Sequence, residues 1–249
     1  MNQYTRIKVR EIIKHNDSVI TLVLDEKIDY KPGQFVMLWI PGIGEKPFSL
    51  SSENTITLRK VGELTTHIFT SQPEYIYIRG PYGNFFPEKE GVAIGGGCGI
   101  APLYGLLHRR NFPIKKFVLA CKTKEDLLFL DEIKEKCKET IAVTDNGSYG
   151  TKGRVTDIEI PKAKNYFICG PEKMMKAVAE KLVSEGVKPE NIYLSMERYM
   201  KCAVGICGNC SFSGYRVCAD GPVFSYDKIK DLPHFAAFHR TRTGELVKF

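Results

Sequence analysis

Four cysteines near the carboxyl end limit the fold of this 249-residue chain more than any other feature of its sequence. They fall within 17 residues, at Cys202, Cys207, Cys210 and Cys218. The other four cysteines are scattered singly, at Cys98, Cys121, Cys137 and Cys169. An even number of cysteines would suggest disulfides in a secreted protein, whereas clustered thiols in a reducing compartment indicate a metal site. The segment that carries them is therefore expected to wrap a metal centre.

The spacing of these cysteines indicates which metal group they hold. Cys-x4-Cys-x2-Cys with a fourth cysteine further on is the ligand spacing of plant-type two-iron ferredoxins. Small residues between the ligands allow a loop to wrap a cluster and donate N–H groups to its sulfurs, namely Ala203, Gly205 and Gly208. The alternative is a four-cysteine zinc site, which normally shows two Cys-x2-Cys pairs, and this chain has one. We expect a [2Fe–2S] cluster.

Composition and charge exclude several other classes of protein. Hydrophobic residues make up 43% of the chain and charged residues 26%, which is ordinary for a globular protein. No run approaches the 18 apolar residues of a membrane helix, and residues 1–15 lack the apolar core of a signal peptide. The net charge of +7 is spread along the chain, without a local nucleic-acid patch. We expect a cytoplasmic protein that binds neither membranes nor nucleic acid.

Residues 1–88 are predicted to form short strands. Apolar patterns favour strands at 6–10, 19–24, 34–40, 55–61 and 75–79, with Pro-Gly and Gly-Pro pairs between several of them. Regularly spaced short strands without long helices favour a small antiparallel barrel.

After residue 88 strands alternate with helices. Strands are predicted at 92–94, 116–121, 141–144 and 166–169, and helices at 101–110, 125–138 and 171–184. This alternation indicates a parallel α/β sheet. The cysteines dominate from residue 195, and the last thirty residues are expected to be an irregular tail. The fold class is thus α+β and multi-domain, with a barrel at 1–88, an α/β domain at 89–194 and an iron–sulfur region at 195–249.

A glycine-rich turn, Gly95-Gly96-Gly97, lies between a predicted strand and a predicted helix. Glycines there allow backbone N–H groups to approach a pyrophosphate, and the helix amino terminus adds partial positive charge. Ile100 follows where the standard dinucleotide fingerprint has its third glycine. A tight turn that binds no ligand therefore remains the alternative.

The segment Lys46-Pro47-Phe48-Ser49 combines a cation, an aromatic ring and a hydroxyl near the end of a predicted strand. A flavin needs such a set: a positive charge for its pyrophosphate, an apolar face for its ring and a donor near N5. Taken by itself, the segment is also consistent with a plain strand end.

Together these motifs resemble the ferredoxin–NADP reductase superfamily. In chain order they are Lys-Pro-Phe-Ser at 46–49, Gly-Pro-Tyr-Gly at 80–83, the glycine-rich turn at 95–102 and Cys-Gly-Pro at 169–171. The segments 195–202 and 217–224, with the cysteines between them, resemble the electron-transfer subunit of the two-subunit, NAD-linked (type B) dihydroorotate dehydrogenases, and the resemblance covers nearly the whole chain. Flavin subunits of sulfhydrogenases and of NADH:NADP transhydrogenases share these motifs and remain alternatives.

The resemblance implies FAD in the barrel, NAD(H) in the α/β domain and the cluster on the four clustered cysteines. The implied FAD contacts are Lys46, Pro47, Phe48, Ser49, Leu58, Arg59, Lys60, Leu64 and Thr65. The implied NAD(H) contacts are Gly95, Gly96, Gly97, Cys169, Gly170 and Pro171. Lys46 replaces the arginine of relatives, so it can meet a phosphate but cannot bind it bidentately. Cys169 could instead be a buried strand end, and the three remaining cysteines are expected to be packing residues.

The resemblance also implies an electron relay. A hydride passes between nicotinamide C4 and flavin N5 near Ser49, and the cluster carries single electrons to or from the FMN of a dihydroorotate dehydrogenase catalytic subunit. The implied assembly is a heterotetramer that serves pyrimidine biosynthesis. Such a relay needs no acid, base or nucleophile, so no catalytic side chain is expected. A zinc-stabilised nucleotide-binding module is the distant alternative, and the sequence does not distinguish NADH from NADPH.

Overall fold

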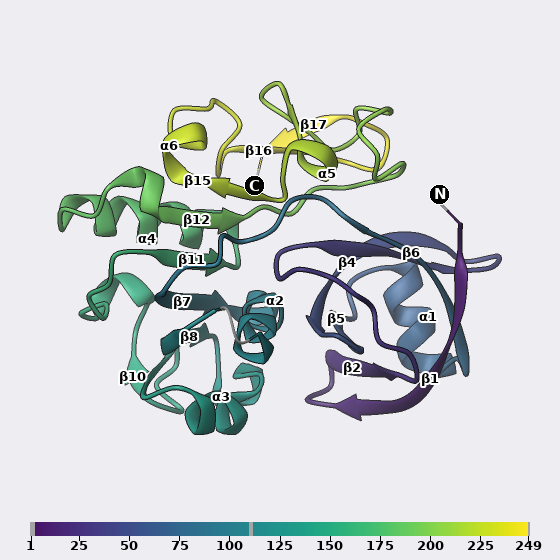
Figure 1. Ribbon diagram of the computed structural model, residues 1–249, viewed down its shortest axis with the longest axis horizontal. Helices are drawn as coiled ribbons and strands as arrows, with labels where there is room; N and C mark the ends of the chain where they lie inside the picture. The colour runs from purple at the N-terminus through teal and green to yellow at the C-terminus, as the bar shows by residue number, and fades with distance from the viewer. Residues whose placement is uncertain (1–2, 110–111, 249) are drawn as a thin grey trace.

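The computed structural model describes residues 3–109 and 112–248. Two sheet structures lie side by side, a barrel on the right and a parallel sheet on the left of Figure 1, and the residues after 195 lie across the top of both. Within the described ranges, none of the helices is both long and apolar enough to cross a membrane. The expected α+β multi-domain class, with barrel, parallel sheet and carboxyl-terminal region, is confirmed.

Six antiparallel strands close the barrel in the order β1-β2-β5-β4-β3-β6. They are β1 (Thr5–Lys14), β2 (Val19–Leu24), β3 (Phe35–Ile40), β4 (Gly44–Ser52), β5 (Thr55–Arg59) and β6 (Tyr75–Tyr82). The helix α1 (Glu63–Ser71) follows β5 and buries Leu64 and Ile68 against the barrel core. Local sequence does not predict this helix, because its threonines favour helix weakly and only tertiary packing makes the segment helical.

The second sheet has the strand order β10-β9-β8-β7-β11-β12-β15. Its parallel strands are β7 (Gly91–Gly96), β8 (Ile114–Cys121), β9 (Glu139–Thr144), β10 (Thr151–Lys152), β11 (Tyr166–Cys169) and β12 (Ile192–Ser195). The last strand, β15 (Val223–Ser225), is antiparallel to β12. The helices of this part are η1 (Gly97–Gly99), α2 (Ile100–Tyr104), η2 (Gly105–His108), η3 (Lys124–Asp126), α3 (Leu130–Lys136), η4 (Val155–Asp157), α4 (Glu172–Ser184) and η5 (Pro189–Asn191).

Two helices differ from their predictions. The helix predicted at 125–138 is the short turn η3 followed by α3, because Phe129 between them has a left-handed φ of +57°. Leu127 and Leu128 are buried as predicted but precede the regular helix. The helix predicted at 101–110 is α2 followed by the tighter turn η2, and its predicted end at residue 110 lies outside the described residues.

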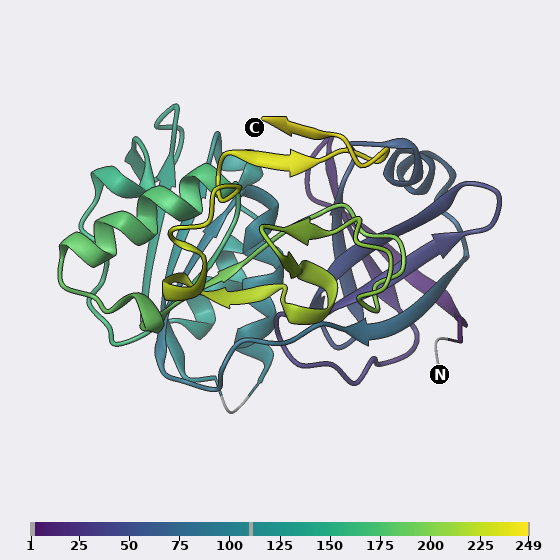
Figure 2. The same ribbon diagram turned by 90° about the horizontal axis from the view of Figure 1, so that it is seen from above.

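The carboxyl-terminal region is more regular than predicted. It contains β13 (Ser211–Phe212), β14 (Tyr215–Arg216), α5 (Val217–Asp220), α6 (Tyr226–Ile229), β16 (Phe238–Arg240) and β17 (Leu246–Lys248). The prediction of an irregular tail is therefore wrong. Figure 2 shows the β16–β17 hairpin over the junction between the parallel sheet and the barrel.

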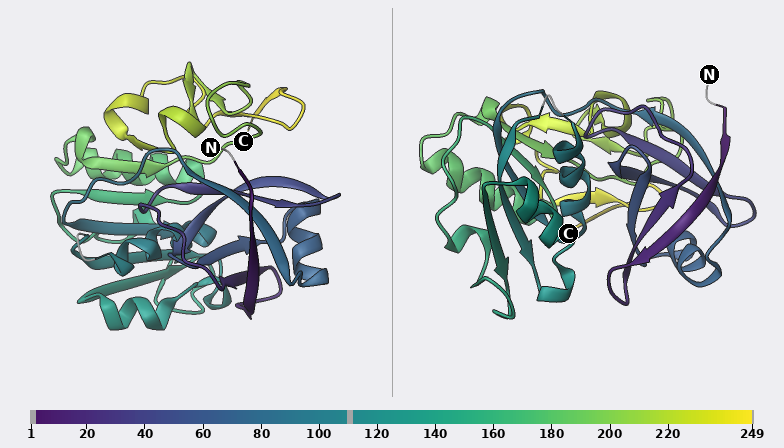
Figure 3. Two further views of the ribbon diagram at one scale, coloured as in Figure 1. Left: turned by 45° about the vertical axis from the view of Figure 1, so that its right-hand side comes forward. Right: turned by 60° about the horizontal axis from the view of Figure 1, so that its bottom comes forward.

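One buried apolar cluster reaches all three parts of the chain. Met37 of the barrel, Ile168 of the parallel sheet and Cys210 of the carboxyl-terminal region belong to the same buried apolar cluster. The Asn84 side chain donates hydrogen bonds to the carbonyls of Asp220 and Val223. Figure 3 shows the carboxyl-terminal region resting against both sheet structures, so its position relative to each is fixed by packing.

Candidate functional site

The carboxyl ends of β7 and β11 form a crevice edge at which the strand order changes direction. From β7 the chain proceeds outward through β8 and β9, and then returns to the other side of β7 with β11. In parallel α/β sheets, ligands bind where the order reverses in this way. Cys169 pairs in register with Gly95, so the structure brings together the two segments that were predicted to bind NAD(H).

Close backbone approach explains the glycines of this edge. A Cβ on Gly99 would lie 2.3 Å from the carbonyl oxygen of Cys169, and a Cβ on Gly96 would lie 2.4 Å from the sulfur of Met174. Gly97 has a φ of +54°, in the left-handed region that favours glycine. The turn is therefore built so that η1 and α2 lie directly against β11.

Two thiols and one carboxylate line this edge. Burial raises the pKa of Cys98, and burial together with the charge of Glu197 raises the pKa of Cys169 to about 12. Both thiols are therefore protonated at neutral pH and are poor nucleophiles. Glu197 is solvent-accessible, yet the protein atoms packed around its carboxylate raise its pKa. Sequence patterns do not reveal Glu197 as a site residue, because its neighbours in the crevice come from distant strands.

An arginine from the barrel faces the glycine-rich turn. The Nε atom of Arg59 is buried and has no hydrogen-bond partner within residues 3–109 and 112–248. Its Nη2 atom lies 3.6 Å from the position of a Cβ on Gly97, and apart from the chain neighbours of Gly97 it is the one heavy atom of the described residues within 4 Å of this position. A buried guanidinium nitrogen without a partner, next to backbone that leaves space, fits an anionic group such as a phosphate.

The segment expected to bind the flavin lies on β4 and is half-buried along its length. The ammonium of Lys46 lies 4.0 Å from the centroid of the Tyr199 ring, which belongs to the segment leading to the cysteine loop. Phe48 packs against the barrel core, and Ser49 alternates with it along the strand.

The other expected flavin residues lie in two environments. The side chains of Leu58 and Leu64 are buried in the barrel core, while Lys60 is exposed. The hydroxyl of Thr65 accepts hydrogen bonds from the N–H groups of Val61 and Gly62, both at 3.0 Å. The N-cap residue of α1 is Gly62, which has no side chain to accept hydrogen bonds from the first-turn N–H groups, so these groups remain for an anion. At this end of the barrel, a ligand can therefore reach backbone N–H groups of α1 but not the buried side chains of Leu58 and Leu64.

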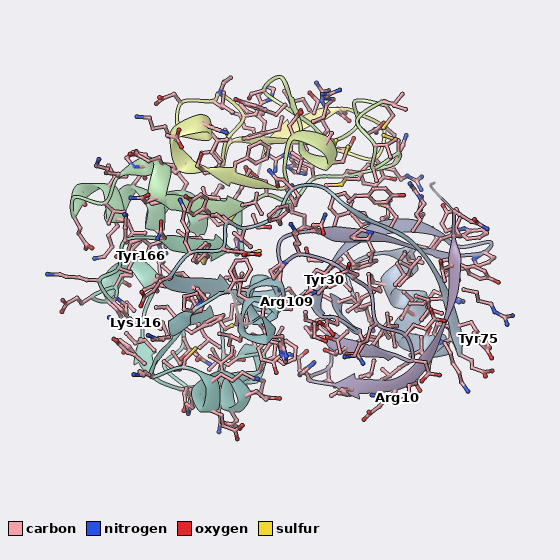
Figure 4. All side chains as sticks on the ribbon, viewed as in Figure 1. Arg10, Tyr30, Tyr75, Arg109, Lys116 and Tyr166 are labelled. Atoms are coloured by element: carbon pink, nitrogen blue, oxygen red, sulfur yellow. The ribbon has the colours of Figure 1, made fainter. Side chains whose placement is uncertain are left out.

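A salt-bridged contact holds the barrel against the parallel sheet beside the crevice. Arg109 lies 3.2 Å from the carboxylate of Glu53 on the barrel and donates a hydrogen bond to the carbonyl of Tyr30. Figure 4 shows Tyr30 and Arg109 between the two sheet structures. Their contact helps to hold the barrel and the parallel sheet together.

The four clustered cysteines come together as two pairs. The N–H of Cys207 lies 3.5 Å from the sulfur of Cys202, and the N–H of Cys218 lies 3.5 Å from the sulfur of Cys210. Cys207 is exposed and Cys202 half-buried, whereas Cys210 and Cys218 are buried. Within the described residues, no three His, Cys, Asp or Glu side chains are gathered as ligands of a single ion. Two thiol pairs match a two-iron cluster, in which each iron takes two thiolates.

Backbone N–H groups surround the sulfurs of this loop. The N–H of Gly205 donates to the sulfur of Cys218 at 3.2 Å. Burial raises the pKa of Cys202, but N–H groups from Val204, Ile206 and Cys207 outweigh it and lower the pKa to about 6. Left-handed backbone conformations turn the chain around the thiols, at Ala203, Gly205 and Gly208. This donor set, thiolates within a cage of N–H groups, fits an iron–sulfur cluster.

Comparison with known proteins identifies the family. The family model for the iron–sulfur cluster binding domain of dihydroorotate dehydrogenase B matches residues 197–230, and the family model for an oxidoreductase NAD-binding domain matches residues 93–180. The probable dihydroorotate dehydrogenase B (NAD(+)) electron transfer subunit of Pyrococcus horikoshii is 38% identical over 247 residues, with 97% of each chain covered. The corresponding subunit of Methanocaldococcus jannaschii is 40% identical over 255 residues, again with 97% of each chain covered. The chain belongs to this family of electron transfer subunits.

Solved structures agree with this family on the fold. A structure described as the NADH-dependent reduced ferredoxin–NADP oxidoreductase, studied for flavin-based electron bifurcation, superposes with a TM-score of 0.75. The two chains are 26% identical, and 94% of this chain and 95% of that chain are covered. Phthalate dioxygenase reductase, at 16% identity and a TM-score of 0.62, shares the fold.

Family membership confirms the expected activity class and cofactors. The chain is the electron-transfer subunit of an NAD-dependent oxidoreductase and works with a catalytic partner subunit. Its cofactors are FAD, NAD(H) and a [2Fe–2S] cluster.

Proposed function

We propose that this chain passes electrons between NAD(H) and the FMN of a dihydroorotate dehydrogenase catalytic subunit, in cytoplasmic pyrimidine biosynthesis. The observation that carries the proposal is the cysteine loop, whose two thiol pairs lie in the region that matches the dihydroorotate dehydrogenase B cluster domain. None of the eight cysteines forms a disulfide within the described residues, which is usual in a reducing compartment. The proposed assembly with the catalytic subunit is a heterotetramer.

We assign each cofactor to the region of the chain that carries its sequence motif. We assign residues 1–88 to FAD, 89–194 to NAD(H) and 195–249 to the cluster. The pairing of β15 with β12 supports a third region that is built onto the second rather than linked loosely to it. When bound, NAD(H) and FAD would exchange a hydride, which carries two electrons. The flavin can exchange these electrons with the cluster one at a time.

The crevice residues are assigned to NAD(H), which they would bind and shield from water. We assign the NAD(H) pyrophosphate to the turn at Gly95, Gly96 and Gly97, because glycines there allow a ligand to approach the backbone closely. The segment Cys169–Pro171 provides the opposite wall for the nicotinamide. Cys169 contributes a protonated, apolar thiol surface there rather than a reactive group.

The barrel residues hold the flavin. Arg59 supplies a buried cation that lacks a protein partner for its Nε, and the first turn of α1 at Leu64 and Thr65 supplies backbone N–H groups. Lys46 adds a second cation and Ser49 a hydroxyl donor on β4, with Pro47 and Phe48 as the apolar part of the same strand. Leu58 and Lys60 flank Arg59, and Leu58 contributes through its backbone because its side chain is buried in the barrel.

The four clustered cysteines hold the cluster, and the tip of their loop faces the partner. Ile206 is 84% exposed and Cys207 is exposed beside it. We assign the loop tip to the interface because the exposed Cys207 brings the proposed cluster to the surface there, where the cofactor of a partner can come close to it. No acid, base or nucleophile is assigned, because each residue named here binds, orients or shields a cofactor.

The test is reconstitution with the proposed partner. The holoprotein, combined with an FMN-containing dihydroorotate dehydrogenase catalytic subunit, should oxidise dihydroorotate to orotate and reduce one NAD+ to NADH for each orotate formed. Heat should release FAD from this chain. A complex that reduces NAD+ with hydrogen, or that exchanges hydride between NADH and NADP+, but does not oxidise dihydroorotate would show that the partner is wrong. A colourless protein containing zinc would favour the nucleotide-binding module instead.

A further inference from the structure

Arg79 lies at the contact between the barrel and the cysteine loop. It belongs to β6, and its side chain is 8% exposed. Its Nη1 donates to the carbonyl oxygen of Cys202 at 2.9 Å, and its Nη2 donates to the carbonyl oxygen of Lys201 at 3.0 Å. A guanidinium from the flavin domain thus binds the backbone of the first cysteine of the cluster loop.

Glu45 orients this guanidinium from the other side. Its two carboxylate oxygens accept hydrogen bonds from Nε at 2.6 Å and from Nη2 at 3.0 Å, which is the bidentate geometry of a strong ion pair. The hydroxyls of Tyr4 and Tyr82 accept from Nε and Nη1, each at 3.3 Å. Each guanidinium nitrogen therefore has a partner, and the side chain is held in one position.

The same strand connects this contact to the flavin segment. Glu45 directly precedes Lys46 on β4, and Lys46 contacts Tyr199, three residues before Cys202. The strand assigned to the flavin thus meets the segment that carries the cluster loop directly through Lys46, and it reaches that loop indirectly through the pair of Glu45 with Arg79.

We propose that Arg79 is a positioning residue that fixes the cluster loop on the flavin strand and, through its charge, sets the reduction potential of the cluster, with Glu45 opposing that charge. The proposal rests on the proposed function for the identity of the flavin strand, but it concerns this chain alone.

Electrostatics gives opposite signs for the two partners. Reduction adds one negative charge to the cluster, so a nearby cation favours the reduced form and a nearby anion disfavours it. Removing the charge of Arg79 should lower the ratio of reduced to oxidised cluster at a fixed potential. Removing the charge of Glu45 should raise that ratio. A residue with a merely structural role would not give two shifts of opposite sign.

The experiment is a redox titration of the isolated holoprotein, followed by the electron paramagnetic resonance signal of the reduced cluster. At the wild-type midpoint potential, Arg79→Gln should lower the reduced-to-oxidised ratio about tenfold, and Glu45→Gln should raise it several-fold. Arg79→Lys keeps the charge and should restore the ratio to within about threefold of wild type. Arg6→Gln is the matched control: Arg6 lies exposed on the same barrel against Tyr75 and should leave the ratio unchanged.

Rates test the positioning role. After mixing with NADH, cluster reduction should slow at least tenfold in Arg79→Gln relative to flavin reduction in the same sample, because misplacement of about 1 Å is costly. An unchanged ratio in Arg79→Gln, or shifts of the same sign in both variants, would overturn the proposal. If Arg79→Gln does not retain its cluster, Glu45→Gln decides: a raised ratio supports the role, and an unchanged ratio refutes it. Failure to form orotate with the partner would refute the proposed function without altering these readings.

Discussion

The substitution Gly99→Ala tests whether the crevice depends on close approach of the glycine-rich turn to β11. The added Cβ would lie 2.3 Å from the carbonyl oxygen and 2.4 Å from the carbonyl carbon of Cys169, whereas real Cβ atoms essentially never come closer than 3.0 Å. Both neighbours are backbone atoms and cannot rotate away. The turn and the end of β11 must therefore separate by several tenths of an ångström or more.

The cost has two parts. Overpacking of this kind lowers the free energy of unfolding by about 1–3 kcal/mol. For a chain of this size, 1 kcal/mol corresponds to about 2–4 °C, so the melting temperature should fall by about 2–12 °C. Separation of the two crevice walls should also reduce the efficiency of flavin reduction by NADH, by about 10- to 100-fold, since misplacement near 1 Å has effects of that size.

The assay combines calorimetry with rapid mixing of the holoprotein and NADH, followed by flavin absorbance. Gly186→Ala is the control: Gly186 has a φ of +91°, and a Cβ added there would meet no atom of a neighbouring segment within 4 Å, so alanine adds backbone strain alone. It should lower stability by about 1 kcal/mol and leave NADH efficiency unchanged. The reasoning is refuted if Gly99→Ala reduces flavin with wild-type efficiency, or if Gly186→Ala slows reduction equally.

Three further effects are expected. Arg198→Leu should lower the free energy of unfolding by about 3–5 kcal/mol in denaturant titrations, because it leaves the buried carboxylate of Glu172, 2.5 Å away, without its cation. Adding Glu172→Leu should recover part of that loss, and no recovery would contradict the pairing. Burial lowers the pKa of His15 below 6.5, so protons bind the unfolded chain preferentially and stability falls as the pH falls below about 6.5. His15→Gln should reduce the dependence of the melting temperature on pH in this range, and an unchanged dependence would exclude His15 as its source. Ile206→Lys should weaken binding to the catalytic subunit at least tenfold while leaving cluster content unchanged, and unaltered affinity in a binding titration would exclude the loop tip from the interface.

Local patterns were sufficient to predict most strands of the barrel and of the parallel sheet, but not β4, β10, β12 or β15. The strand over 19–24 and the strand over 166–169 have the predicted bounds, since apolar runs between turn residues specify them locally. The spacing of the four cysteines likewise predicted a loop that wraps an iron–sulfur cluster, and the family model for such a domain matches this region. The helix α1 could not be predicted in this way, because Leu64 and Ile68 make it helical only by packing on the barrel.

Contacts between distant segments explain the site residues that sequence patterns do not reveal. Arg79 and Cys202 are separated by 123 positions, and Arg79 precedes a Gly-Pro turn that gives no sign of the loop it meets. Glu197 approaches Cys98 and Cys169 because β7, β11 and the segment after β12 end on the same edge of the sheet. Positions of this kind depend on strand order, which local propensity does not specify.

The central claim is that the cluster lies between the flavin and the partner and carries the electrons that pass between them. Cys207→Ser tests it most directly, with flavin content measured first because cluster assembly also supports folding. A folded, flavin-loaded Cys207→Ser protein should still be reduced by NADH and should still reduce an artificial dye, while electron transfer with the catalytic subunit is lost. Transfer to the catalytic subunit at the wild-type rate in that protein would show that the cluster is structural and that the electron path is wrong.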